Sequence, residues 1–242
     1  MKRVLVTGAA SGIGAALYRL LEEDGIEAVG LDLTGSDIDC DLTREDAVAA
    51  LASRVRGPLH GIAHVAGLPG TAPAAQIMAV NASAPMHVTR TLLHHLVEES
   101  AIVVVSSITA LRCEASTDRL DAFIDGTAQT DPQIDGKAAY ELSKAVVNRW
   151  ALRSVADLSG RRIRINTVSP GPIETPILID FERSIGADRI AGAAALAGRH
   201  GDPREVAQVC RFLLSSDASW VNGADVKVDG GYHAMRAAGA GA

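Results

Sequence analysis

Tyr140 and Lys144 stand four positions apart in a segment with helical periodicity, so both side chains would lie on one face of a helix. A free phenol has a pKa of about 10 and is a poor base at neutral pH. A neighbouring ammonium group would stabilise the phenolate and lower that pKa, so the tyrosine could donate and accept a proton. Because this spacing also occurs on ordinary helix surfaces, the pair indicates proton-transfer chemistry only together with other residues.

Two further polar residues could complete such a site. Ser107 follows the apolar run 102–105 at the end of a predicted strand, where its hydroxyl could hold a substrate oxygen near the tyrosine. Ser106 is the alternative, because alternation along a strand points the two hydroxyls in opposite directions. Asn81 lies inside a predicted helix, where asparagine is a poor helix former. It is either a tolerated polar residue or the anchor of a proton-relaying water.

A glycine-rich loop near the N-terminus predicts a nucleotide site. The short strand 4–6 runs into this loop, and a helix over 13–23 follows. Glycines let the backbone turn sharply and approach a pyrophosphate, whose charge is favoured by the amides at a helix N-terminus. The binding residues predicted from this loop are Gly8, Ser11, Gly12, Ile13 and Gly14.

Asp32 ends the second predicted strand and indicates which cofactor binds there. A carboxylate at this place can accept hydrogen bonds from both ribose hydroxyls of the adenosine half, and it would repel the 2′-phosphate of NADP. No Arg or Lys occurs from Thr7 through Ser11, or directly after Asp32, to neutralise that phosphate. NAD is therefore the predicted cofactor, in preference to NADP.

Two later positions extend the predicted cofactor site. Asp41 and Leu42 follow the third strand, where an adenine pocket would lie, and Ala66 and Gly67 follow the fourth, where a ribose shelf would lie. Taken alone, Asp41 could equally be a carboxylate that caps a helix.

Short β-branched runs alternate with longer helical patterns, which is typical of βαβ units around a parallel sheet. Strands are predicted at 4–6, 27–31, 38–40, 59–65, 101–106, 162–168 and 225–228. Helices are predicted at 13–23, 43–54 with Thr43 as its cap, 74–98, 140–158 and 203–215. The expected fold is α/β: a single-domain, Rossmann-type, doubly wound parallel sheet of seven strands with helices on both faces and ligands at the carboxyl ends of the strands.

One domain is expected over residues 1–242. The segment 111–136 is polar, carries more acid than base and is long for a connection in a compact domain, so it is either functional or mobile. The tail 237–242 is small and glycine-rich, and fraying is expected there.

Composition excludes several function classes. The formal net charge is −6 and there is no long basic run, which argues against nucleic acid as a partner. Three cysteines without a CxxC spacing argue against a disulfide framework and favour the cytoplasm. No apolar run is long enough to cross a membrane. Metal catalysis has little support, because His94 and His95 would point apart on a helix and no HExxH or Cys cluster occurs.

The order of these motifs resembles the short-chain dehydrogenase/reductase family, over essentially the whole chain from Lys2 to about Tyr232. The resemblance implies that Tyr140 exchanges a proton with the substrate oxygen and that Ser107 orients it. Lys144 would hold the nicotinamide ribose and tune Tyr140, and Asn81 would support a water chain; together these four would be the catalytic tetrad. The segment 170–175 resembles the family's nicotinamide-binding loop, which adds as cofactor contacts Pro170, Gly171, Ile173 and Thr175.

Two departures from the family pattern matter. His64 occupies a slot that is usually asparagine, and we interpret it as a strand residue rather than an acid–base group. Ser107 and Tyr140 are 33 positions apart, far more than in most members, so 111–136 contains an insertion. The pattern resembles bacterial 3α-hydroxysteroid dehydrogenase/carbonyl reductases and their coniferyl-alcohol dehydrogenase relatives. The helix after the insertion commonly makes subunit contacts in the family, so we expect a homodimer rather than a tetramer.

The expected activity is NAD-dependent interconversion of a hydrophobic alcohol and its ketone or aldehyde. No Arg or Lys is placed obviously to bind a carboxylate or phosphate, so the small-molecule substrate is expected to be uncharged. The segment 177–200 is either a flap that closes on the substrate or an ordinary surface helix. Alternative functions are an aryl-alcohol (coniferyl-alcohol-like) dehydrogenase and a non-catalytic NAD-binding regulator. Sugar-nucleotide epimerases share the YxxxK motif but usually carry a further substrate domain.

Overall fold

Seven parallel strands form one sheet in the order β3-β2-β1-β4-β5-β6-β7, in a computed structural model that describes residues 2–239. The strands are β1 Arg3–Thr7, β2 Glu27–Asp32, β3 Ile38–Asp39, β4 Leu59–His64, β5 Leu96–Val105, β6 Arg164–Pro170 and β7 Asp225–Val228. The chain starts in the middle of the sheet, runs to one edge and then crosses to fill the other half. This arrangement confirms the predicted doubly wound parallel sheet.

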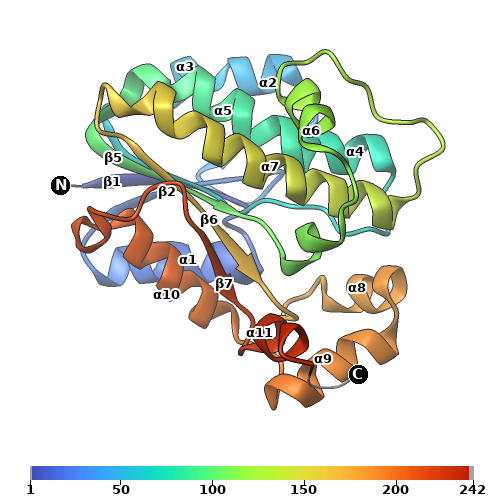
Figure 1. The fold of residues 1–242 in the computed structure, drawn as a ribbon. Coiled ribbons are helices and arrows are strands. Elements are labelled where there is room, and N and C mark those ends of the chain that lie inside the picture. The colour runs from blue at the N-terminus through green and yellow to red at the C-terminus, as the bar shows by residue number, and fades with distance from the viewer. Residues whose placement is uncertain (1, 240–242) are drawn as a thin grey trace.

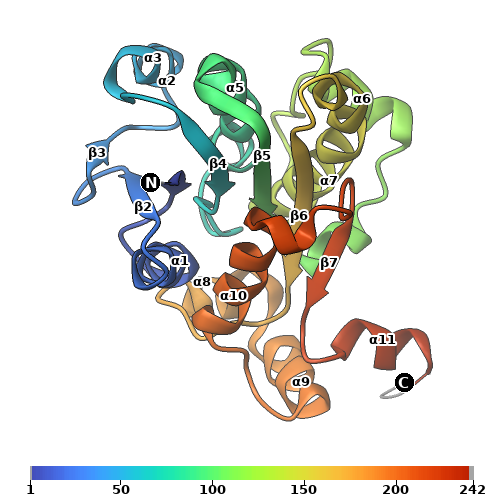
Figure 2. The same cartoon turned by 90° about the vertical axis from the view of Figure 1, so that its left-hand side faces the viewer.

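Helices cover both faces of the sheet (Figure 1). Figure 2 shows α1 and α10 on one face and α5 and α7 on the other, with α2, α3 and α6 on the same side as α7. The helices are α1 Gly12–Glu23, α2 Glu45–Ala49, α3 Leu51–Arg54, α4 Ala74–Met78, α5 Ala84–Leu92, α6 Thr117–Ile124, α7 Gly136–Ser159, α8 Leu178–Ile185, α9 Ala187–Ala197, α10 Pro203–Leu214 and α11 Tyr232–Ala237. Shorter helical turns are η1 Ala79–Ser83, η2 Leu93–His95, η3 Ile108–Arg112 and η4 Ser216–Ala218. Of the tail expected to fray, residues 240–242 lie outside the described residues.

Side chains that alternate along the central strands belong to two separate hydrophobic cores, one on each face of the sheet. In β1, Leu5 points into the core shared with α5 and α7, while Val4 and Val6 point into the core shared with α1 and α10. A parallel sheet covered on both faces needs apolar residues in both directions, which explains its nearly continuous aliphatic strands. The strands end where their buried residues end, so the loops that follow them meet at one edge of the sheet.

The predicted helix 74–98 is wrong at its C-terminal end and is not regular in its middle. Strand β5 already begins at Leu96, which is buried and pairs with Leu59 of β4. Sheet pairing therefore overrides the helical pattern there. Between α4 and α5 the chain widens into the π-helical turn η1, and Asn81 lies inside that turn. Such turns are frequent at functional sites because they redirect a single side chain.

The predicted helix cap at Thr43 is also wrong. Helix α2 begins at Glu45, after Arg44, and no side chain caps it. Thr43 instead donates its amide and its hydroxyl to one carboxylate oxygen of Asp41, at 2.9 and 2.7 Å. The Asp41 carboxylate therefore takes the hydrogen bonds of Thr43, and the Thr43 hydroxyl does not cap the helix.

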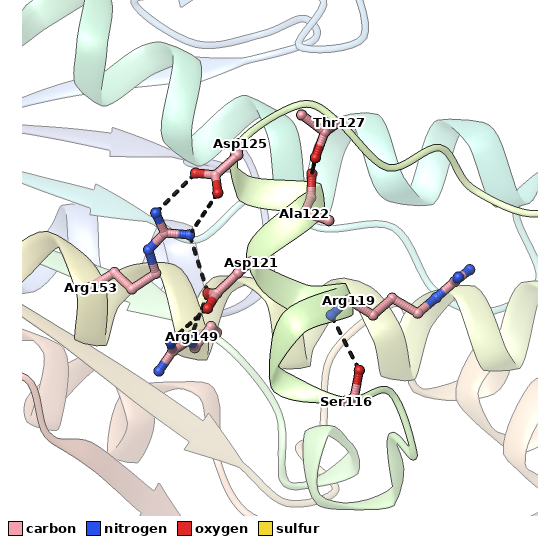
Figure 3. Close-up of polar contacts among 8 residues, drawn as sticks. All are labelled: Ser116, Arg119, Asp121, Ala122, Asp125, Thr127, Arg149 and Arg153. Atoms are coloured by element: carbon pink, nitrogen blue, oxygen red, sulfur yellow. Dashed lines mark hydrogen bonds and ion pairs between the residues drawn. The ribbon is translucent and has the colours of Figure 1, made fainter.

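The insertion over 111–136 contains η3's last residues and α6, and α6 packs on the outer face of α7. Figure 3 shows the contact: Asp121 accepts hydrogen bonds from two nitrogens of Arg149, both at 2.7 Å. Arg153, one turn further along α7, reaches Asp121 at 3.2 Å and Asp125 at 2.9 Å. Because these half-buried side chains form a bidentate network rather than a single exposed pair, they hold α6 in place.

Candidate active site

The carboxyl ends of the parallel strands meet at one cavity of about 500 Å³. Among the sequence-predicted site residues, all but Asn81 line it. The lining members are Gly8, Ser11, Gly12, Ile13, Gly14, Asp32, Asp41, Leu42, Ala66, Gly67, Ser107, Tyr140, Lys144, Pro170, Gly171, Ile173 and Thr175. The fold therefore brings together, at the expected edge of the sheet, residues that are distributed over most of the sequence.

The glycine loop folds back tightly onto the start of α1. Gly8 has a φ of +72°, a conformation that glycine adopts without strain. A Cβ on Gly14 would overlap with the carbonyl oxygen of Gly8, so only glycine permits this close approach of the loop and the helix. The amides at the N-terminus of α1 consequently face the cavity beside the loop, as a pyrophosphate site requires.

Asp32 lies across this loop from the helix. One carboxylate oxygen accepts a hydrogen bond from the amide of Ala10 at 2.9 Å, and the other accepts from the amide of Leu33 at 2.7 Å. The Gly8 amide donates to the carbonyl oxygen of Leu31, which ties the loop to the end of β2. The carboxylate is thus fixed at the rim of the cavity, where it can still accept further hydrogen bonds.

Asp41 caps no helix. Its carboxylate forms a local turn with Thr43, and hydrogen bonds from the Thr43 side chain and amide lower the pKa of Asp41. The residue nevertheless lines the cavity together with Leu42 and Thr43. The Asp41 carboxylate is thus satisfied by Thr43 and does not cap a helix, and its proposed place beside the adenine stays a prediction.

The loop after β4 is held from both sides. The Thr7 hydroxyl accepts hydrogen bonds from the amides of Val65 and Ala66, at 3.0 and 3.1 Å. On the other side, Asn81 accepts from the amide of Leu68 at 2.7 Å and donates to the carbonyl oxygen of Leu68 at 2.9 Å. Thr7 was not singled out from the sequence, although a threonine that ends a strand beside a glycine loop was a signal for such a contact.

Asn81 is therefore a residue that positions the loop. Its side chain is buried, and its amide nitrogen also lies 3.3 Å from the hydroxyl oxygen of Ser143 on α7. A Cβ on Gly67 would lie 3.5 Å from the Asn81 oxygen and 3.6 Å from Lys144 Nζ, so the loop, η1 and α7 converge at this point. The π-helical turn is what directs the Asn81 amide sideways onto the loop.

Tyr140 and Ser107 meet in the middle of the cavity. Both side chains are buried, and Ser107 Oγ accepts hydrogen bonds from the amide and the hydroxyl of Thr109, at 3.2 and 3.0 Å. Burial raises the pKa of Tyr140 above its ordinary value, and hydrogen bonding with the nearby Ser107 side chain opposes that rise. The Ser106 hydroxyl donates to the carbonyl oxygen of Lys144 at 3.2 Å. Ser106 also lines the cavity, so the choice of Ser107 over Ser106 as the catalytic serine stays a prediction.

Lys144 is almost fully buried one helical turn after Tyr140. Its ammonium group donates to the carbonyl oxygen of Val105 at 2.9 Å and lies 5.6 Å from the centre of the Tyr140 ring. Burial lowers the pKa of Lys144 to about 8. A buried cation that reaches a strand end beside a phenol is costly to stability, and such groups cluster at functional sites.

His64 is a buried structural residue, as the sequence interpretation held. Its Nε2 lies 2.8 Å from the hydroxyl oxygen of Thr89, and its ring packs edge-on against Trp150. Burial lowers the pKa of His64 to about 3, so the imidazole is neutral at physiological pH. The residue points into the core, away from the cavity of Tyr140.

The loop after β6 closes the cavity from the other side. Pro170 is the last residue of β6, and a Cβ on the following Gly171 would lie 2.9 Å from Cβ of Asp229. A Cβ on Gly12 of the glycine loop would lie 3.4 Å from the Thr175 methyl group. The two loops that resemble cofactor-binding segments therefore approach each other across the cavity.

Helices α8 and α9 form the apolar wall beside Tyr140. The Phe181 ring meets the Tyr140 ring edge-on, with the ring centres 5.2 Å apart, and Ile185 and Ile190 line the same wall. Figure 1 shows α8 beside the N-terminal end of α7, which carries Tyr140. The segment 177–200 is thus a pair of helices that faces the cavity, with an apolar surface where a substrate would contact it.

Two cations that the sequence analysis did not name line the same cavity. Arg112, the last residue of η3, and Arg189, in the first turn of α9, both line the cavity. Neither arginine belongs to a recognised motif, and each lies in a segment whose sequence shows no clear periodicity. The position of Arg112, five residues after Ser107 at the end of a strand, was the available signal.

Neither a membrane-spanning helix nor a metal site emerges in the part of the chain that the structure describes. No helix over residues 2–239 combines the length and the apolar character needed to cross a membrane. Over the same residues, no group of three or more His, Cys, Asp or Glu side chains is arranged to hold a metal ion.

Comparison with known proteins agrees with this geometry. The family model described as short chain dehydrogenase matches residues 2–117, and the model described as enoyl-(acyl carrier protein) reductase matches residues 127–233. A 3-alpha-hydroxysteroid dehydrogenase from Pseudomonas sp. B-0831, solved in complex with NADH, superposes with a TM-score of 0.86 at 34% identity, over 98% of this chain and 99% of that one.

Two curated relatives extend along nearly the full chain. The coniferyl-alcohol dehydrogenase of Pseudomonas sp. strain HR199 is 29% identical, over 95% of this chain and 96% of its own. The 3-alpha-hydroxysteroid dehydrogenase/carbonyl reductase of Comamonas testosteroni is 28% identical, over 97% of this chain and 98% of its own. The chain belongs to the short-chain dehydrogenase family and is an oxidoreductase.

Proposed function

We propose that this chain is an NAD-dependent dehydrogenase that interconverts a hydrophobic alcohol and its ketone or aldehyde, in the manner of hydroxysteroid dehydrogenases/carbonyl reductases. The observation that carries the proposal is the placement of Tyr140, Ser107 and Lys144 together in a cavity whose other end is the glycine loop with Asp32. Two relatives and one solved structure are named for alcohol or hydroxysteroid dehydrogenation, which supports the same reaction class.

The residues present fit NAD. Glycine at positions 8 and 14 leaves backbone room that a Cβ would fill, and Asp32 offers a carboxylate at the rim. NAD, when bound, accepts the hydride during oxidation and returns it during reduction. The residues that would hold it are those named above from the glycine loop, the ends of β2 to β4, and the loop after β6. The structure solved with NADH in the 34% identical relative supports this choice.

The protein's own side chains would handle the proton. During oxidation the Tyr140 phenol oxygen takes the proton of the substrate hydroxyl, and during reduction it returns a proton to the carbonyl oxygen. Ser107 holds that oxygen in place through its hydroxyl. Lys144 favours the phenolate through its charge and would bind the nicotinamide ribose, while Asn81 fixes the loop behind the ribose. The apolar wall around Phe181 excludes water from the reacting atoms.

The test is turnover with each cofactor on a panel that contains a 3-hydroxysteroid, coniferyl alcohol and cyclohexanol. We expect reduced cofactor to form at least about tenfold more efficiently with NAD than with NADP, because Asp32 would face the 2′-phosphate with a like charge. Formation is followed by near-ultraviolet absorbance. More efficient turnover with NADP would contradict the role of Asp32, and tight NAD binding without turnover of any alcohol would favour the non-catalytic regulator.

Aryl-alcohol oxidation is the second candidate function. The 29% identical relative is named for coniferyl alcohol, and the edge-on contact of Phe181 with Tyr140 offers an aromatic surface beside the proposed reacting oxygen. The same panel distinguishes the candidates, since coniferyl alcohol would then be oxidised with a higher kcat/KM than the steroid or cyclohexanol.

We also propose that the protein is a homodimer. Helix α6 occupies part of the outer face of α7, so this face is covered by the protein's own chain. Light scattering of the purified protein is expected to give the mass of two chains. A tetramer in which residues of the α7 outer face crosslink between subunits would contradict the proposal.

A cytoplasmic location is proposed on the state of the cysteines. Cys40, Cys113 and Cys210 are all free thiols, and Cys40 and Cys210 are buried in the cores. Free cysteines suit a reducing compartment, because an oxidising one favours disulfide formation.

A further inference from the structure

The charged side chains that line the cavity are segregated along its length. The carboxylates, Asp32 and Asp41, both lie at the adenosine end. At the other end, around Tyr140 and Phe181, the charged lining residues in the described part of the chain are Arg112, Lys144 and Arg189, and no carboxylate is among them. The substrate half of the cavity is therefore a positively charged region within mostly apolar walls.

The two arginines reach the cavity from different segments. Arg112 ends η3, the turn that follows directly on Ser107, so its position is tied to the proposed catalytic serine. Arg189 belongs to α9, which continues the α8 wall that holds Phe181 against Tyr140. Figure 1 shows α8 beside the N-terminal end of α7, and α9 next to α11. A molecule held at Tyr140 would thus meet guanidinium groups carried by two separate segments.

Neither guanidinium is engaged by an acid of the protein. Within residues 2–239, the ion pairs of 4.0 Å or less include Arg149, Arg153 and many surface arginines, but neither Arg112 nor Arg189. Polar side chains that converge on a ligand site and lack a partner within the protein are available to bind one. This distinguishes the two residues from arginines whose role is to fasten one helix to another.

Glu141 of α7 is acted on by both charges but forms no ion pair of 4.0 Å or less with either arginine. The charges of Arg112 and Arg189 both act on Glu141 of α7, as do those of Lys137 and Asp135, yet one carboxylate oxygen of Glu141 is buried without a hydrogen-bond partner. Asp135 accepts from the amide of Ala138 as the cap of α7. Burial raises the pKa of Glu141.

We propose that Arg112 and Arg189 bind a carboxylate that the substrate carries at the end remote from its reacting alcohol. Guanidinium groups match the planar shape of a carboxylate and form charge-assisted hydrogen bonds with it. The apolar wall between them and Tyr140 would contact the body of the molecule. The inference rests on the proposed dehydrogenase function and narrows its substrate class, from an uncharged hydrophobic alcohol to a hydroxy acid with an apolar body.

The experiment compares acids with their methyl esters, which differ mainly in charge. Initial rates with NAD are measured for 4-hydroxycyclohexanecarboxylate and for a 3-hydroxysteroid carboxylic acid, each beside its ester. The unmodified protein is expected to have at least about tenfold higher kcat/KM for the acid. In the double variant Arg112→Gln, Arg189→Gln, kcat/KM for the acid should fall by about 10- to 100-fold, chiefly through KM, while the ester is unaffected.

The matched control is Arg183→Gln, which removes the same charge from neighbouring helix α8. Arg183 does not line the cavity and pairs with Asp180 at 3.6 Å. This variant should retain the preference for the acid. Equal kcat/KM for acid and ester in the unmodified protein, or an equal loss for both in the double variant, would overturn the proposal.

A binding measurement separates failure of this proposal from failure of the dehydrogenase function. Both acids and both esters are titrated calorimetrically into the protein saturated with NADH, where no alcohol oxidation occurs. Tighter binding of an acid than of its ester, lost in the double variant, supports the carboxylate site even if no alcohol is turned over. Turnover of cyclohexanol with no difference in binding between acids and esters keeps the dehydrogenase function and rejects the carboxylate site.

Discussion

The Tyr140→Phe variant is expected to oxidise alcohols about 10²- to 10⁴-fold more slowly than the unmodified protein, with NAD affinity nearly unchanged. The substitution removes only the phenol oxygen that would take the substrate proton, and Phe fills the same buried space. Steady-state kcat gives the loss, and quenching of protein fluorescence by the cofactor gives the affinity. A variant that retains more than about a tenth of the rate would show that another group transfers the proton.

Tyr232→Phe is the matched control. Tyr232 begins α11 and also lines the cavity, but it takes no part in the hydrogen bond with Ser107. The same chemical change should leave kcat within about a factor of two or three. A comparable loss in both variants would indicate that the cavity, rather than the Tyr140 oxygen, is sensitive to losing a hydroxyl.

The pH dependence of the unmodified protein follows from the same oxygen. Because burial raises the pKa of Tyr140, the phenol is mostly protonated near neutral pH. Oxidation, which needs the phenolate, should therefore become faster as pH increases, and reduction, which needs the phenol, should be favoured at lower pH. Opposite trends in kcat/KM for the two directions check this, and they should vanish in Tyr140→Phe.

The Gly14→Ala variant should lose NAD affinity by about 100-fold and lower the free energy of unfolding by about 1–3 kcal/mol. The added methyl group would overlap with the carbonyl oxygen of Gly8, which is backbone and cannot rotate away. The loop must therefore separate from α1, and the amides that face the cavity move with it. Calorimetric titration with NAD and urea unfolding measure the two effects.

Gly160→Ala provides the control for that variant. Gly160 ends α7, and a Cβ there would meet no atom within 4 Å. NAD affinity should not change in this variant. Unchanged NAD affinity in Gly14→Ala as well would mean that the close approach of loop and helix is not required for cofactor binding.

The arrangement of the sheet could be predicted from the sequence because it depends on local patterns. Aliphatic runs such as 102–105 and the glycine loop report burial and backbone geometry directly, so the seven-stranded, doubly wound parallel sheet followed from them. The end of the helix predicted over 74–98 was wrong because Leu96 gains more from pairing with β4 than from continuing a helix. Thr43 failed as a cap for a similar reason, since Asp41 was the nearer partner.

The substrate end of the cavity was less predictable. Tyr140, Ser107 and Lys144 carry recognisable spacing, and the structure places them together. Arg112 and Arg189 come from turns whose direction depends on how η3 and α9 pack, and no periodic pattern encodes that. The contact of Asn81 with Leu68 likewise depends on one π-helical turn, whose extra residue cannot be distinguished from a regular helix by composition.

Arg149 and Arg153 are hydrogen-bonded to Asp121 and Asp125. These two arginines belong to the same helix, α7, as Tyr140 and Lys144. The support of that helix is therefore intramolecular. A helix supported by a second copy of the chain loses its support when the protein is diluted below the dissociation constant of the assembly. A helix supported by its own insertion keeps that support in every molecule at every concentration.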